Sequence, residues 1–170
     1  WGDGKVDEKD LEVLMSHWGQ EVYDPTLITH WKLDEASGTV VTDSAGTNNG
    51  TLIGNPLWQP AGGKIGGALE FSGVANFVTA SVVRNPSQGP FSVLAWVKGG
   101  APGQVILSQA GGANWLMANP ATGALMTELQ YSGRAGGAPL SSQTVVTDGN
   151  WHRVGLSWDG SNRILSVDHV

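Results

Sequence analysis

Two stretches of eight residues decide the fold of this 170-residue chain: FSVLAWVK at 91–98 and WHRVGLSW at 151–158. Both are free of proline and rich in β-branched and aromatic residues, which is typical of β-strands. In the second stretch Val154, Leu156 and Trp158 alternate with other residues and share one face with His152, which predicts a strand with one buried side. The first stretch is apolar on both faces and therefore predicts a strand in the middle of a sheet.

Clusters of turn-forming residues separate further short runs of the same kind on both sides of these stretches. Examples of such clusters are DSAGTNNG at 43–50 and PAGGKIGG at 60–67. Apolar residues alternate over 27–33, which predicts another strand with one buried face. The remaining predicted strands lie near 39–42, 51–53, 68–71, 76–80, 104–109, 114–118, 124–130, 143–147 and 163–168.

The composition agrees with an all-strand body. The chain has 25 glycines and 8 prolines, and only 14% of its residues are charged, against about 25% in an average globular protein. Strands every few residues with no helical run between them favour a mainly β fold, an antiparallel jelly-roll β-sandwich. There is no cysteine, which excludes disulfides and thiol chemistry. No apolar run is long enough to span a membrane.

Acidic residues are concentrated at the start of the chain. Residues 1–25 carry seven acidic and two basic side chains, whereas residues 26–170 carry eight acidic and seven basic ones. Neither part has the basic stripe that a phosphate backbone requires, so nucleic-acid binding is not expected. The domain boundaries follow from this change: an acidic segment at 1–20, a polar linker at 21–26 and a β-rich body at 27–170.

The acidic segment has the pattern of a calcium loop followed by a helix. The side chains of Asp3, Asp7 and Asp10 and the backbone carbonyl of Lys5 would supply oxygen ligands at alternating positions. The apolar residues over 11–18 then recur with the spacing of one short N-terminal α-helix. Calcium is therefore the one cofactor that the sequence suggests. The alternative is a degenerate, solvated acidic segment, because Trp1 would stand at a ligand position.

The order D-G-x-V-D-x-x-D-L in this segment resembles one repeat of a type I dockerin, a calcium-binding module of secreted polysaccharide-degrading proteins. The resemblance implies a cohesin-like protein partner. Only one repeat is present here, whereas a functional dockerin has two.

Four strings in the body resemble a laminin-G-like jelly roll of the concanavalin A-like lectin and glucanase superfamily. They are HWKLDEASGTVVTDSAGTNNGTLIG, GGALEFSGVANFV, FSVLAWVKGG and DGNWHRVGLSWDGSNRILSVDHV, in the order that the family has them. The resemblance implies a secreted or cell-surface protein with a sugar-binding habit. It also implies further strands after the last of these strings, so we expect this chain to be an internal fragment of a longer modular protein with a C-terminally incomplete jelly roll.

The body offers no pattern of a catalytic site. Glycosidases need two carboxylates about 5–9.5 Å apart across a cleft, and glucanases of this superfamily take them from alternating positions of one strand. No such acidic alternation occurs here, and no serine-hydrolase or metalloprotease motif occurs either. We therefore expect a protein that is not an enzyme.

Aromatic and polar residues provide a candidate ligand-binding set: Asn114, Trp115, Tyr131 and Arg134. An aromatic face stacks on a sugar ring, and polar neighbours then fix the hydroxyl groups. Trp96, in contrast, lies in a strand signature and is predicted to pack in the core. His152 is predicted to be structural.

Together these patterns predict a non-catalytic binding module of an extracellular or cell-surface protein, with a polysaccharide or glycan as its partner. Two alternatives stay open: a protein-adhesion or spacer module, and an accessory domain of a glycoside hydrolase whose catalytic domain lies outside this chain.

Overall fold

The computed structural model describes residues 24–81, 83–129 and 138–168. Every regular element in these ranges is a β-strand, and all pairings between strands are antiparallel. The strands are β1 (Val40–Val41), β2 (Gly50–Ile53), β3 (Leu57–Gln59), β4 (Ala68–Glu70), β5 (Phe77–Thr79), β6 (Phe91–Lys98), β7 (Val105–Ser108), β8 (Asn114–Ala118), β9 (Ala124–Thr127), β10 (Leu140–Val145), β11 (Trp151–Trp158) and β12 (Arg163–Val167). The predicted calcium loop and N-terminal helix lie outside the described residues.

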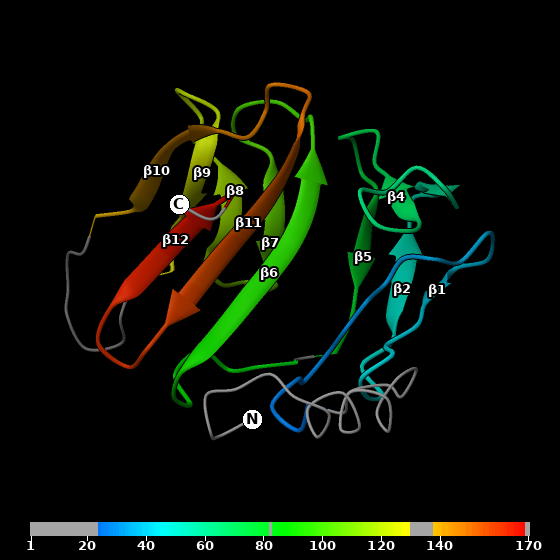
Figure 1. Cartoon of the computed structure of the whole chain (residues 1–170), viewed down its shortest axis with the longest axis horizontal. Helices are drawn as coiled ribbons and strands as arrows, with labels where there is room; N and C mark the ends of the chain where they lie inside the picture. Colours follow the sequence, from blue (N-terminus) through cyan, green and yellow to red (C-terminus); the bar gives the residue numbers. More distant parts are fainter. Residues whose placement is uncertain (1–23, 82, 130–137, 169–170) are drawn as a thin grey trace, which may run out of the picture.

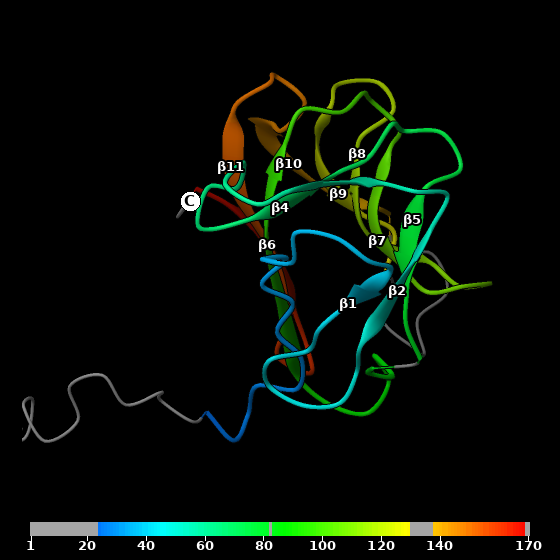
Figure 2. The same cartoon turned by 90° about the vertical axis from the view of Figure 1, so that its right-hand side faces the viewer.

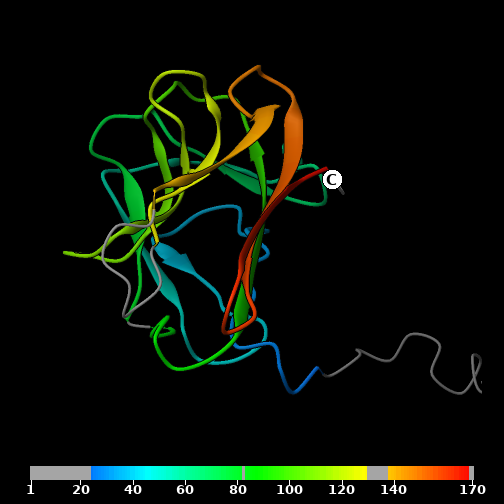
Figure 3. The ribbon, with the colours of Figure 1, turned by 90° about the vertical axis from the view of Figure 1, so that its left-hand side faces the viewer.

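Two antiparallel sheets form a sandwich. One has the strand order β12-β11-β6 and the other the order β10-β9-β8-β7, and they face each other across the core (Figures 1 and 3). A third sheet, β1-β2-β5, and the hairpin β3-β4 lie to the right of β6 in Figure 1 and extend away from the sandwich. The predicted mainly β sandwich is thus confirmed at the level of its class and its antiparallel sheets.

The core lies between the two sheets of the sandwich. Val154 and Leu156 of β11 are fully buried and pack with Leu116 of β8 and Leu125 of β9. The alternate residues of β6 from Phe91 to Val97 pack against the same cluster. Burying such aliphatic side chains removes apolar surface from water and is the main stabilising contribution to a sandwich of this kind.

The strand FSVLAWVK forms as predicted, but it is not central. Among the described residues β6 is an edge strand, since it pairs with β11 on one side only. The strands that are buried on both faces are β8 and β9 in the opposite sheet. Apolar residues on both faces of β6 therefore do not mean that both faces are covered, and one of them is exposed.

Residues 27–33, predicted as a strand, make only an isolated bridge between Trp31 and Asp43. Leu33 has a φ of 60°, which breaks the extended conformation. The carboxylate of Asp43 instead organises this part of the chain, because it accepts hydrogen bonds from the backbone N–H groups of His30, Ala45 and Asn48. Burial favours the neutral form of Asp43, but these N–H donors outweigh it, and its pKa lies below the ordinary value.

Candidate functional site

The outer face of the β12-β11-β6 sheet carries an exposed aromatic and apolar surface. Successive residues of a strand point to opposite sides, so the residues between the core positions of these strands point outward. We call this surface the Trp96 face. It consists of Ser92, Leu94, Trp96 and Lys98 of β6, Trp151, Arg153, Gly155 and Ser157 of β11, and Ile164 and Ser166 of β12.

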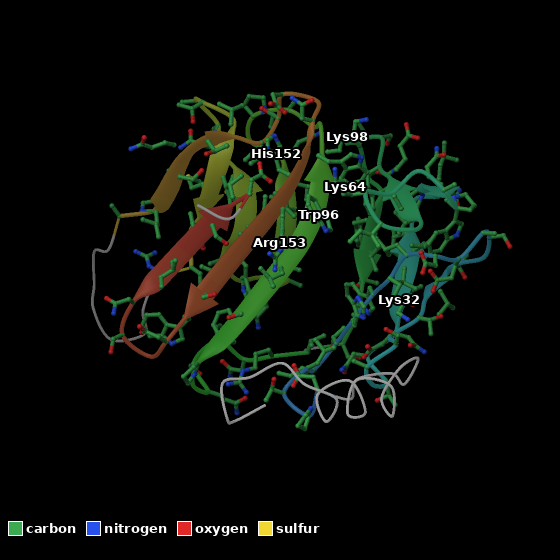
Figure 4. The ribbon with its side chains drawn as sticks, in the orientation of Figure 1. Lys32, Lys64, Trp96, Lys98, His152 and Arg153 are labelled. Carbon is green, nitrogen blue, oxygen red and sulfur yellow. The ribbon has the colours of Figure 1, made fainter. Side chains whose placement is uncertain are left out.

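Trp96 lies on β6, at the edge of this face, and is 36% exposed (Figure 4). It stands directly opposite Arg153 in the β6–β11 register. The prediction that Trp96 packs in the core is therefore wrong. It shares its side of the strand with Ser92 and Lys98, and this polar alternation is the signal in the sequence that could have placed it outward.

On one side of Trp96 the Trp96 face is low. Leu94 is 58% exposed and stands opposite Gly155, which has no side chain to rise above the sheet. A Cβ atom at Gly155 would lie 2.8 Å from Leu94 Cδ2 and 2.6 Å from Ser166 Oγ. The side chains of Leu94 and Ser166 therefore lie close to the space above the glycine. The hydroxyl groups of Ser92 and Ser157 are 2.9 Å apart and hydrogen-bonded across the strands. The result is a low area around Gly155 on the exposed face, next to the longer side chain of Arg153.

A loop from outside the sheet places a cation on this face. Lys64 Nζ lies 5.8 Å from the centre of the Trp96 ring, within the range of a cation–π contact (Figure 4). Lys64 belongs to the β3–β4 connection, 60–67, which Figure 2 shows passing beside the upper part of β6. At the end of that loop, Asp34 Oδ1 accepts the N–H of Gly67 at 2.7 Å, and Gly66 has a φ of 63° that suits glycine.

Of the four ligand-binding residues predicted from the sequence, the structure describes Asn114 and Trp115, and both lie on β8, away from the Trp96 face. Trp115 is 7% exposed and belongs to the core, where its ring centre lies 5.1 Å from that of Phe91. Asn114 donates from Nδ2 to Glu128 Oε2 at 2.7 Å. Tyr131 and Arg134 lie outside the described residues. The indole ring of Trp115 thus has little free face for a sugar, and Trp96 offers more.

His152 has the structural role predicted for it. It is 7% exposed at the end of β11, where Nδ1 lies 2.6 Å from Asp168 Oδ2 and Nε2 lies 2.9 Å from Asp148 Oδ1. Burial disfavours the charged ring, but the two carboxylates outweigh it and raise the pKa of His152 above its ordinary value. Hydrogen bonds from the backbone and side chain of Asn150, followed by that from His152, lower the pKa of Asp148 to about 2. The ring thereby joins the β10–β11 turn to the end of β12.

A second polar region lies near the Asp43 loop. An open pocket of about 290 Å³ is lined by Lys32, Asp34, Glu35, Thr42 and Ser44. Glu35 Oε1 accepts the N–H of Thr42 at 2.7 Å, and its buried Oε2 atom has no hydrogen-bond partner. Two adjacent carboxylates are too few to hold a metal ion on their own, and no cluster of three or more metal-ligating side chains occurs in the described residues. The predicted ligands Asp3, Asp7 and Asp10 and the Lys5 carbonyl lie outside them.

The same ranges contain no helix that is long and apolar enough to cross a membrane. Comparisons of the chain with protein-family models, curated proteins and solved structures found no match. The Trp96 face, with an aromatic ring that is 36% exposed, is the candidate functional site of the described residues.

Proposed function

We propose that this chain is a non-catalytic carbohydrate-binding module of a secreted or cell-surface protein. The observation that carries the proposal is the Trp96 ring, held in the outer face of a sheet with its surroundings kept low by Gly155. Flat aromatic rings stack on the C–H faces of sugars, and such contacts need a ring that is fixed in place and open to solvent.

Polar groups around the ring support the same function. Ser157, Ser166 and Arg153 border the apolar centre of the face, and Lys64 stands over the ring. Hydroxyl and cationic side chains hydrogen-bond to sugar hydroxyl groups and so fix the orientation of a stacked ring. An aromatic surface with a border of polar side chains is the arrangement that a glycan needs.

The wider setting is part of the same proposal. A laminin-G-like jelly roll behind a dockerin-like repeat would belong to a modular extracellular protein that acts on or adheres to polysaccharide. Calcium binding by residues 1–10 and a cohesin-like partner stay predictions that rest on the sequence of the first 20 residues.

The proposal is tested by binding of the whole chain to an array of glycans and polysaccharides, first with calcium and then with a chelator. We expect saturable binding that Trp96→Ala abolishes. Val74→Ala, which removes an exposed apolar side chain from the β4–β5 connection, is the matched control and should bind as the parent does. Circular dichroism shows whether each variant is folded. A folded parent chain that binds none of the glycans would contradict the proposal.

Protein adhesion is the second candidate, because Leu94 and Ile164 on the Trp96 face are both more than half exposed. Contiguous exposed apolar side chains mark protein interfaces as well as ligand platforms. If the folded chain binds no glycan and Trp96→Ala has no effect on the array, pull-down with extracellular proteins that is lost on Leu94→Asp would favour adhesion.

A further inference from the structure

Positive charge gathers around the Trp96 ring in a chain whose net charge is −6. Lys64 stands over the ring, Lys98 is two residues away on the same side of β6, and Arg153 lies opposite on β11. These are three of the seven basic residues of the body. Figure 4 shows Lys64, Lys98 and Arg153 around Trp96, whereas Lys32 lies well to the right of this group.

The three cations around Trp96 differ in their acidic neighbours. Within the described residues neither Lys64 nor Lys98 forms an ion pair. Asp34 contacts the loop that carries Lys64, where its Oδ1 atom accepts the N–H of Gly67. Asp168 accepts the backbone N–H of Arg153, but it also holds His152 at the end of the sheet.

From this arrangement we infer that the site selects anionic sugars, with the ring of the sugar on Trp96 and its carboxylate or sulfate group on Lys64; this inference rests on the proposed function. A sugar that stacks on Trp96 takes the place of the ammonium group above the ring. Lys64 then loses its contact with the aromatic face and needs another partner. An anionic substituent on the same sugar supplies that partner, whereas a neutral sugar does not.

The position of Lys64 supports its role as a specificity-determining residue. Its loop is attached to Asp34 at Gly67, so the backbone that carries the lysine is anchored while the long side chain stays free to turn. A lysine side chain is a mobile point charge, which suits an anion whose geometry varies between sugars. Lys98 adds positive potential along the same face and so favours a chain of repeated anionic units over a single one.

The experiment compares matched polysaccharides that differ in charge. Pectin of high methyl esterification and the same pectin after de-esterification show whether the site selects a carboxylate group. Agarose and κ-carrageenan show whether it selects a sulfate group. We expect the whole chain to bind at least one anionic polymer roughly tenfold or more tightly than its neutral counterpart in low salt. The preference should shrink near 1 M NaCl, where charges are screened over about 3 Å.

Variants then show which residue is responsible for the preference for anionic polymers. Lys64→Gln should remove most of the difference between anionic and neutral polymers, and Lys64→Arg should restore it. Lys32→Gln removes an exposed lysine far from Trp96 and should leave the preference intact.

Three results would overturn the inference. Equal binding of neutral and anionic polymers would show that charge has no part in selection, and the proposed function would stand. An anionic preference that Lys64→Gln leaves unchanged would assign it to another part of the chain. Equally tight binding of single-stranded DNA would show a general polyanion surface. Loss of all glycan binding in a folded chain is a separate outcome, because it contradicts the proposed function itself.

Discussion

The two faces of the β12-β11-β6 sheet are built from the same three strands and differ completely in their environment. On the inner face Val154 and Leu156 are fully buried against the opposite sheet. On the outer face Leu94 and Ile164 are 58% and 56% exposed, and Trp96 lies between Leu94 and Lys98 on the same side of β6. The comparison teaches that apolar side chains in a strand do not by themselves identify the core. What covers each face decides whether they stabilise the fold or remain open to a ligand.

The largest expected effect separates two tryptophans. Trp115→Ala should lower the free energy of unfolding by about 3–5 kcal/mol, because it empties a large volume of the core next to Phe91. Trp96→Ala should cost less, about 1–2 kcal/mol, because its side chain is only partly covered on the outer face. Chemical denaturation of both variants measures the difference. Equal losses would show that the outer face is covered as well.

The next effect concerns His152, whose ring joins the β10–β11 turn to the end of β12. His152→Asn should lower the free energy of unfolding by about 1–2 kcal/mol near pH 6, since charge-assisted hydrogen bonds to Asp148 and Asp168 are lost. The free energy of unfolding of the parent chain should also depend on pH. The raised pKa of His152 gives stability that is complete below about 6.5 and lost as pH rises through the higher folded value.

The same site responds to acid in the opposite direction. The pKa of Asp148, lowered from 3.8 to about 2, gives stability that is present above about 4 and lost as pH falls toward 2. Unfolding midpoints across pH 2–9 should therefore be highest between the two limits. In His152→Asn the decline on the alkaline side should disappear. If the variant keeps the alkaline decline, another group is responsible for it.

A smaller effect is expected at the loop that carries Lys64. Asp34→Ala removes the acceptor of the Gly67 N–H and should cost about 0.5–1.5 kcal/mol. It should also weaken the anionic preference of the outer face, because the lysine is no longer anchored. Asp34→Asn keeps an oxygen acceptor and is the matched control. Limited proteolysis in the glycine-rich loop should be faster for the alanine variant, and equal rates would contradict the anchoring role.

The smallest change is Gly155→Ala on the outer face. The new Cβ atom would displace the ends of Leu94 and Ser166, which are flexible side chains, while alanine suits a strand better than glycine does. We expect the free energy of unfolding to change by less than about 1 kcal/mol. The effect should appear instead as weaker glycan binding, since the flat surface beside Trp96 is raised. A loss of stability as large as that of Trp115→Ala would show that Leu94 cannot move.

The sequence predicts the positions of most strands because their apolar residues alternate between turn clusters. Phe91–Lys98, Asn114–Ala118 and Trp151–Trp158 have the predicted bounds. The short strand Leu57–Gln59 was not predicted, since Pro56 and Pro60 on either side of it are typical of a loop. Residues 27–33 alternate without forming a strand, because the Asp43 carboxylate takes the backbone N–H of His30 and leaves only one bridge.

The candidate site was harder to predict, because it depends on contacts between distant segments. The sequence offers Trp115 as a candidate ligand-binding residue and places Trp96 in the core, whereas Trp115 is 7% exposed and Trp96 is 36% exposed. The approach of Lys64 to Trp96 joins positions 32 residues apart, through a loop whose fold depends on Asp34. No local sequence pattern predicts that contact. The structural role of His152, in contrast, was confirmed.

The position of β6 at the edge of its sheet has a consequence for hydrogen exchange. In an antiparallel pair the N–H groups of one strand point alternately toward the partner and away from it. Along Phe91–Lys98, half of the amides face β11, and the other half face the side where no described strand pairs. Amide protection along this single strand should therefore rise and fall with a period of two residues, whereas β11, which has a partner on each side, should be protected throughout.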